Sequence, residues 1–303
     1  MADMSVNICG VDFKNPVIPA SGAFGYGREY EELFPLGKLG GIATKGTTLH
    51  KRTGNLSPRI AETPAGMLNS VGLQNPGIDH FIDVDLPYLL TKDVVILANI
   101  AGSTPEECAE AAAKLDDTEV HMIELNISCP NVKQGGAAFG TSCEMAAEVT
   151  KRVRAATKKP LIVKLSPNVT SIADIARSVE AAGADAVSLI NTLLGMRIDI
   201  NTGRPILRNN VGGLSGPAVF PVAVRMVWQT ANAVKIPVIG MGGVSSGRDA
   251  IEMMMAGASA VQVGAALFTD PYAPVRIVEE MNEFLDNKGI ASVRDIIGSV
   301  KPW

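Results

Sequence analysis

The stretch PVIGMGGVSSGRDAIEMMMAGASAVQVGAALF, residues 237–268, places a helical segment between two strand-like runs. Pro237–Gly240 and Ala260–Val263 are short and apolar, and Arg248–Ala256 has the composition of a helix. Glycines follow each strand-like run, Gly242-Gly243 after the first and Gly264 after the second. Two neighbouring strands connected through a helix run parallel, so this stretch predicts one repeating unit of a parallel α/β sheet.

The same alternation extends back to the N-terminus. Six more strand-like runs precede this stretch: Val17–Ala20, Gly41–Thr44, Val94–Ile100, Val120–Ile127, Leu161–Leu165 and Ala186–Ile190. The other helical segments are Glu29–Phe34, Ile78–Leu90, Pro105–Leu115, Glu144–Thr157, Ile172–Ala182, Ala218–Val234 and Pro274–Asn287. Eight strands alternating with eight helices favour a closed (β/α)8 TIM barrel over an open doubly wound sheet.

Other segments fit around this barrel. Val6–Ile8 and Val11–Phe13 are predicted to form a short N-terminal β-hairpin. Thr47–Pro76 and Leu193–Gly216 are rich in turn residues and read as insertions after the second and sixth strands, and another insertion follows the fourth. No low-complexity linker divides the chain, so residues 1–303 are predicted to form a single domain.

Composition excludes several classes of function. The net charge of −4 and the pI of about 5.5 lack the excess of positive charge that is typical of nucleic-acid-binding proteins. No apolar run approaches the roughly 18 residues of a membrane span, and the N-terminus lacks the features of a signal peptide. Four cysteines without a CxxC pair and three histidines argue against a metal or iron–sulfur site. We therefore expect a cytoplasmic protein without a metal, in which Cys9 and Cys108 are small buried apolar residues.

Polar side chains gather at the predicted ends of the strands, where TIM barrels carry their active sites. In chain order they are Ser21, Lys45, Asn99, Asn126, Ser128, Cys129, Asn131, Lys164, Asn191 and Thr192. Any one of them could be a satisfied buried group, but so many in an ordinary core would be costly. Together they predict a polar cup for a flat ligand that makes many hydrogen bonds.

The glycines after the last two strands point to a phosphate. Backbone amides at the ends of strands 7 and 8 form the frequent phosphate site of this fold. Gly242-Gly243 and Gly264-Ala265 occupy those positions, and two such turns favour phosphate binding over tight turns alone. No Walker A motif is present, and no GxGxxG follows the first strand, so a dinucleotide-binding Rossmann fold is disfavoured.

Several long motifs resemble the dihydroorotate dehydrogenases from about Val6 to Phe268. They are ASGAFGYG (20–27), TKGTT (44–48), NSVGLQNPG (69–77), LNISCPNV (125–132), VKLSPNVTSI (163–172), LINTLLGMRID (189–199), GGLSGPA (212–218) and GMGGVSSGRDA (240–250). Cys129 at the position of the base, without an N-terminal helical extension, resembles class 1. The run SCPNVKQGGAAFGT (128–141) resembles the NAD-linked type 1B.

The resemblance implies a reaction and a set of contacts. The enzyme would oxidise (S)-dihydroorotate to orotate in de novo pyrimidine biosynthesis, with Cys129 as base, Lys45 beside it and FMN as hydride acceptor. The implied FMN contacts are Ser21, Lys45, Gly46, Asn99, Asn126, Lys164, Ile190, Gly216, Gly242, Gly243, Gly264 and Ala265. The implied substrate contacts are Lys45, Asn69, Ser70, Val71, Gly72, Leu73, Asn126, Asn191 and Thr192.

Three implied details concern single positions. Lys164 would stabilise the anionic reduced flavin. Ala265 stands where the family often has threonine, so we expect somewhat weaker FMN binding. Gln134–Thr141 is predicted to belong to a lid that closes over the substrate.

The resemblance also implies partners. Type 1B enzymes are homodimers that bind an electron-transfer subunit, giving a dimer of heterodimers. That subunit carries FAD and a [2Fe–2S] cluster and passes electrons to NAD. The sequence itself shows no surface for this partner, and the chain lacks the cysteines for a cluster of its own.

Three alternatives remain open at this level. A class 1A-like enzyme would use fumarate or another acceptor. A sugar-phosphate isomerase or aldolase would also use the glycine turns, with Lys164 or Lys45 as a Schiff-base lysine. In a barrel that only binds a ligand, Cys129, Lys45 and Lys164 would have no catalytic role.

Overall fold

Eight parallel strands form one sheet in the computed structural model, which describes residues 2–128 and 139–303. In spatial order they are β3 (Val17–Pro19), β16 (Ala260–Val263), β15 (Val238–Met241), β10 (Ala186–Leu189), β9 (Leu161–Lys164), β8 (Met122–Asn126), β7 (Val95–Ile100) and β4 (Gly41–Ala43). The Gly40 amide donates to the Val17 carbonyl at 3.1 Å, which connects the two outermost strands. The sheet therefore closes, and the predicted (β/α)8 barrel is confirmed.

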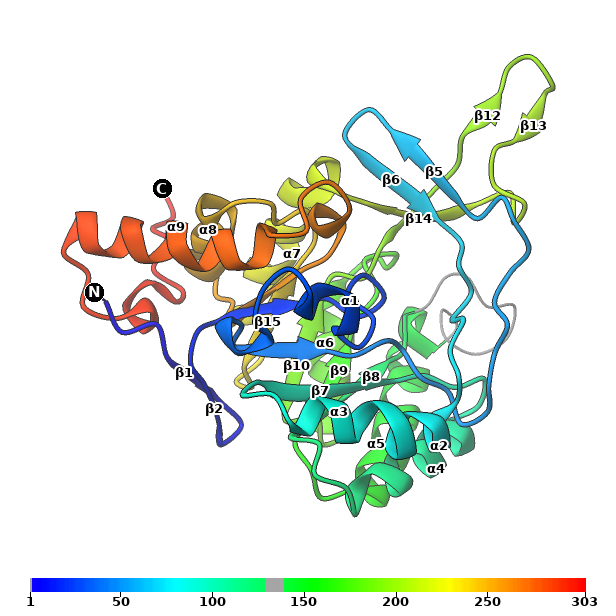
Figure 1. Ribbon diagram of the computed structural model, residues 1–303, viewed down its shortest axis with the longest axis horizontal. Helices are drawn as coiled ribbons and strands as arrows, with labels where there is room; N and C mark the ends of the chain where they lie inside the picture. The colour runs from blue at the N-terminus through cyan, green and yellow to red at the C-terminus, as the bar shows by residue number, and fades with distance from the viewer. Residues whose placement is uncertain (1, 129–138) are drawn as a thin grey trace.

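Helices follow the strands and surround the barrel (Figure 1). They are α1 (Arg28–Glu31), α2 (Ile78–His80), α3 (Leu86–Leu90), α4 (Pro105–Asp116), α5 (Cys143–Ala156), α6 (Ile172–Ala181), α7 (Phe220–Ala231), α8 (Gly247–Met255) and α9 (Ala273–Lys288). Local chemistry sets several starts. The Thr104 side chain accepts from the Glu107 amide and Pro105 begins α4, while Ser246 and Asp249 form a capping box on α8.

One predicted helix is shorter than expected, and another has its predicted ends but contains an unpredicted turn; a proline lies near each of these differences. The helix expected over Glu29–Phe34 ends at Glu31. Phe34 is unsuited to a helical end because it precedes Pro35, a position that disfavours helical backbone. The helix expected over Ile78–Leu90 contains a π-helical turn, Phe81–Asp85, between α2 and α3. Pro87 has no amide hydrogen and crowds the carbonyl four residues earlier, which favours a wider turn at that point.

The insertions after the second and sixth barrel strands combine into one antiparallel sheet. Its order is β11 (Leu193–Gly195), β14 (Gly212–Ser215), β6 (Gly66–Asn69) and β5 (Ile60–Thr63). A further hairpin, β12 (Ile198–Asp199) with β13 (Arg204–Pro205), extends beyond it (Figure 1). The sequence predicted both insertions but not that they pair. The insertion predicted after the fourth strand falls largely on residues 129–138, outside the described residues.

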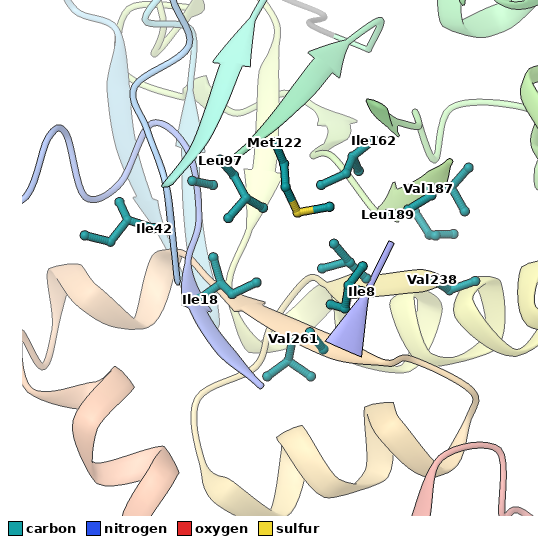
Figure 2. Close-up of a cluster of buried hydrophobic side chains, with 14 of the residues drawn as sticks. Ile8, Ile18, Ile42, Leu97, Met122, Ile162, Val187, Leu189, Val238 and Val261 are labelled. Carbon is teal, nitrogen blue, oxygen red and sulfur yellow. The ribbon is translucent and has the colours of Figure 1, made fainter. Parts of the chain in front are cut away.

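The predicted N-terminal hairpin, β1 (Val6–Ile8) with β2 (Val11–Phe13), is confirmed. Ile8 and Phe13 are fully buried, and Figure 2 shows Ile8 in one apolar cluster with side chains of the barrel strands, including Leu189 and Val261. The hairpin therefore adds apolar side chains to the core of the barrel. Over residues 2–128 and 139–303, no helix has the length and apolar character needed to cross a membrane.

Candidate active site

The ends of β8 and β10 place a cluster of amides and a hydroxyl together. Asn126 Oδ1 accepts from the Ser128 amide and hydroxyl, both at 3.1 Å, and from Asn191 Nδ2 at 3.3 Å. Asn191 Nδ2 also donates to Ser128 Oγ at 2.7 Å. Asn126 and Ser128 are buried, so this network fixes the orientation of amides predicted to contact substrate and flavin.

Lys164 lies beside this cluster at the end of β9, where it is in register with Asn126. The side chain is only 4% exposed, yet its ammonium contacts one hydrogen-bond acceptor among the described residues, Ser21 Oγ at 3.1 Å. An ammonium carries three donors. The predicted pair of Ser21 and Lys164 is thus brought together, with donors left for a bound ligand.

Asn99 at the end of β7 presents a buried acceptor to the same end of the barrel. Its Oδ1 has no hydrogen-bond partner among residues 2–128 and 139–303. A Cβ added to Gly46 would lie 2.9 Å from this oxygen, so the backbone after β4 approaches Asn99 as closely as glycine allows. Lys45 is half-buried next to Gly46, and its amide donates to the Gly25 carbonyl at 3.0 Å.

The segment predicted to bind substrate, Asn69 to Leu73, follows β6. Asn69 is in register with Gly213 of β14, and its side chain donates to the Gly213 carbonyl at 3.4 Å. The Ser70 hydroxyl is buried without a partner in the part of the chain that is described. Val71 and Leu73 are half-buried and Gly72 is buried, so this segment is held against the protein instead of extending into solvent.

Thr192 packs on the same antiparallel sheet. A Cβ on Gly213 would lie 1.9 Å from Thr192 Oγ1, so only glycine fits opposite this threonine. The Thr192 carbonyl accepts from Asn168 Nδ2 at 3.0 Å. The paired insertions thereby bring Asn69, at the end of β6, and Thr192, which follows the sixth barrel strand, next to Gly213.

The glycines predicted to hold phosphate form a backbone cradle. Gly243 has a φ of 79°, and a Cβ there would lie 2.9 Å from the Gly216 carbonyl oxygen, so both conformation and space require glycine. A Cβ on Gly242 would lie 3.0 Å from Ile190 Cγ1. The amides of Gly243, Gly264 and Ala265 donate to no acceptor within the described residues. Such amides are ready donors for a phosphate.

These features fit FMN at the mouth of the barrel. The buried oxygen of Asn99 and the ammonium of Lys164 suit a flat ring with polar edges, and the cradle suits its phosphate. Among residues 2–128 and 139–303, no group of three or more His, Cys, Asp or Glu side chains is arranged to hold a metal ion.

The cysteines differ in their surroundings. Burial, with a smaller effect of Asp185, raises the pKa of the Cys9 thiol to about 11, and burial raises the pKa of Cys108 to about 12. The prediction of a buried apolar residue is confirmed for Cys108, whereas Cys9 is only half-buried, and Cys143 is exposed. The predicted base, Cys129, and the first part of the predicted lid, residues 134–138, lie outside the described residues.

Sequence reasoning missed three residues that hold the site in place. Asn75 connects the substrate segment to the end of β4 by donating to Thr48 Oγ1 and to the Leu73 carbonyl at 2.9 and 2.7 Å. Asn168 fixes the backbone at Thr192. Glu124, fully buried inside the barrel, accepts from the Asn99 side chain. A glutamate between Ile123 and Leu125 in a strand was a detectable signal, because buried carboxylates are rare.

Comparison with known proteins decides the family. The model of the dihydroorotate dehydrogenase family matches residues 3–285. The chain belongs to the dihydroorotate dehydrogenase family. The family indicated by the sequence motifs is therefore confirmed.

Curated members of the family are similar over their full length. The dihydroorotate dehydrogenase B (NAD(+)) catalytic subunit of Bacteroides thetaiotaomicron is 54% identical over 302 residues, covering 99% of this chain and 100% of the relative. The subunit of the same name from Geotalea uraniireducens is 55% identical over 299 residues, covering 98% of each chain. That of Geobacillus sp. is 53% identical, covering 98% of this chain and 96% of the relative.

Proposed function

We propose that this chain is the catalytic subunit of an NAD-linked dihydroorotate dehydrogenase, which oxidises (S)-dihydroorotate to orotate in pyrimidine biosynthesis with FMN bound to it. The observation that carries the proposal is the buried polar cup formed by Asn99, Asn126 and Lys164 in a chain of this family. Relatives that are 54% and 55% identical to this chain are named as such a subunit.

The substrate ring is flat and carries an imide and a carboxylate. An imide presents both donors and acceptors, and side-chain amides match both. Asn126 and Asn191, held by Ser128, would bind and orient this edge of the ring. Lys45 and the amides of residues 70–73 would bind the carboxylate.

Oxidation removes a proton from C5 and a hydride from C6, which leaves a double bond between the two carbons. Cys129 is the proposed base that takes the C5 proton, and FMN, when bound, supplies the hydride acceptor. The buried ammonium of Lys164, held by Ser21, would favour negative charge on the neighbouring ring. Burial of this region keeps water away from the reacting carbons.

Electrons would leave through a second subunit carrying FAD and a [2Fe–2S] cluster, with NAD as the final acceptor. The words "NAD(+)" and "catalytic subunit" in the names of the relatives support this path. We propose a homodimer of this chain that binds two such subunits as a dimer of heterodimers.

An anaerobic titration of the purified chain with dihydroorotate tests the reaction. We expect a yellow protein whose flavin absorbance bleaches in proportion to added substrate. A yellow protein that stays oxidised would contradict the substrate. A protein that remains colourless after FMN is added would contradict the cofactor and favour the sugar-phosphate barrel or a barrel that only binds a ligand.

A second experiment separates the acceptors. The reduced chain is mixed with fumarate, or with NAD in the presence and absence of the co-expressed electron-transfer subunit. We expect reoxidation by NAD only when that subunit is present. Rapid reoxidation by fumarate would favour the class 1A-like alternative instead.

A further inference from the structure

Glu124 occupies the interior of the barrel beside Asn99, a predicted flavin contact. It lies in the middle of β8, is 0% exposed, and is in register with Asn99 of β7. Among the described residues it forms no ion pair. Burying a carboxylate destabilises the protein unless hydrogen-bond donors surround it. The residues that donate to Glu124 therefore indicate its structural role.

Three neutral donors converge on this carboxylate from three other strands. Asn99 Nδ2 donates to Oε2 at 2.5 Å. Ser188 Oγ and Gln262 Nε2 donate to Oε1 at 2.8 and 2.7 Å. All four residues are at least 99% buried, so the network is isolated from solvent. Each carboxylate oxygen thus has its own donors, and Oε2 is the one that binds Asn99.

This contact determines which way the Asn99 amide faces. A carboxylate only accepts hydrogen bonds, so the NH2 group of Asn99 must point to Glu124 and its oxygen must point away. The Asn99 backbone is fixed as well, because its amide donates to Thr44 Oγ1 at 3.1 Å and its carbonyl accepts from the Thr47 amide at 2.9 Å. Only rotation of the amide about its last bond would remain without Glu124.

The oxygen that points away from Glu124 lies beside Gly46, one of the residues that the resemblance assigns to the flavin contacts. Asn99 Oδ1 is buried and has no partner in residues 2–128 and 139–303. A buried acceptor without a donor is unfavourable, so a ligand that donates an N–H to Asn99 Oδ1 would satisfy this acceptor. Gln262 Oε1 is also without a partner in the described part of the chain, but no contact places it at the site.

We propose that Glu124 is a positioning residue that sets the Asn99 amide as an obligatory hydrogen-bond acceptor for a ring N–H of the bound flavin. This inference rests on the proposed function, because it requires FMN at this site. Oxidised isoalloxazine has a single ring N–H, at N3, so the arrangement selects flavins by that group.

The test compares FMN with 3-methyl-FMN, which lacks the N3–H. Dissociation constants are measured on the full chain, stripped of flavin, by quenching of flavin fluorescence. We expect the wild-type chain to bind FMN at least about fivefold more tightly than 3-methyl-FMN, the range of one lost hydrogen bond. This measurement needs no variant and therefore does not depend on the folding of a mutant.

Glu124→Met removes the acceptor at similar side-chain length, so the Asn99 amide is no longer set. We expect FMN binding to weaken about five- to tenfold while 3-methyl-FMN binding changes little, so the ratio of the two constants falls by the same factor. General loosening of the site would weaken both flavins alike. Ser188→Ala is the matched control, because it removes a donor to the other carboxylate oxygen and should keep the wild-type ratio.

The outcomes are distinguishable. Equal wild-type affinity for the two flavins, or an unchanged ratio in Glu124→Met, would overturn the role of Glu124 and leave the proposed function intact. A changed ratio in Ser188→Ala equal to that of Glu124→Met would overturn it too. A wild-type chain that binds no FMN would remove the proposed function, and this inference with it.

Discussion

Two layers inside the same barrel have opposite chemistry. On four strands the inward side chain changes from apolar to polar within two residues, in the pairs Ile42 and Thr44, Leu97 and Asn99, Met122 and Glu124, and Ile162 and Lys164. Figure 2 shows the apolar members in one buried cluster. Every one of the eight side chains is nearly inaccessible, so burial alone does not tell the layers apart.

The difference shows where this fold gains stability and where it gains function. The side chains of the apolar layer have no polar atoms that need hydrogen-bond partners. Removing them from water therefore stabilises the protein. The polar layer must find hydrogen-bond partners, and it finds only some of them within the described residues, as Asn99 and Lys164 show. The remaining donors and acceptors are available to a ligand.

The largest expected effect comes from breaking the apolar layer. Ile162→Ala should lower the free energy of unfolding by about 2–5 kcal/mol, because it leaves a cavity in a fully buried cluster. Urea unfolding measures this loss, and the FMN affinity of the folded protein should stay unchanged. A loss below about 1 kcal/mol would mean that the layer repacks around the smaller side chain.

The second-largest effect is expected in the reactivity of two thiols, Cys9 of the N-terminal hairpin and Cys143 at the start of α5. Because its pKa is raised from 9.0 to about 11, Cys9 is protonated at pH 8, and its thiolate fraction is about 100-fold below that of an unperturbed thiol. Alkylation by iodoacetamide at pH 8, followed by peptide mapping, should modify the exposed Cys143 far faster than Cys9. The rate at Cys9 should rise about tenfold per pH unit below pH 11, because only the thiolate reacts.

The same experiment tests Cys129. If Cys129 is the base, orotate should protect it from iodoacetamide while Cys143 labels at its usual rate. Equal labelling of Cys129 with and without orotate would contradict a place in the substrate site. Labelling of Cys9 as fast as Cys143 would contradict the burial of the hairpin thiol.

Lys164→Met tests the polar layer two residues after Ile162. We expect the rate of flavin reduction by dihydroorotate to fall about 100-fold, as when a charge-stabilising donor is removed from an active site. The free energy of unfolding should change by less than about 1 kcal/mol or rise, since a buried charge with one partner is replaced by an apolar chain. Stopped-flow reduction and urea unfolding give the two values.

That result would mirror Ile162→Ala, which should affect stability and not chemistry. A Lys164→Met protein that is reduced at the wild-type rate would remove Lys164 from the mechanism. A protein destabilised as strongly as Ile162→Ala would show that the two layers contribute to stability in the same way.

Ala265→Thr is expected to have the smallest effect. Threonine at this position restores one hydroxyl donor beside the backbone cradle, so FMN should bind about three- to tenfold more tightly, in the range of one hydrogen bond. Ala266→Thr is the matched control and should leave the FMN dissociation constant unchanged. Equal affinity of the wild-type and Ala265→Thr proteins would show that the backbone amides suffice for phosphate.

Much of the fold could be predicted because each element carries its own signal. The strand Ala260–Val263 was predicted at its observed ends, and the helix predicted from Pro105 begins at that residue. The helical segment Ile78–Leu90 was also predicted at its observed ends, but the π-helical turn inside it, before Pro87, was not. The pairing of β6 with β14 was also missed, since their registers join segments more than 140 residues apart.

The sequence by itself determined the type of fold and the inventory of the site. Periodic apolar runs, glycine turns and polar residues after strands are local properties of the chain, so they can be recognised in the sequence alone. The motifs also indicated the family, which the comparison confirmed.

Only the tertiary structure decided how these residues are used. Glu124 and Gln262 are 138 positions apart, yet they bind each other inside the barrel, and with Asn99 they fix which atom faces the ligand. Hydrogen bonds act over about 3 Å. Which side chains come that close depends on the closure of the sheet, a property of all eight strands together.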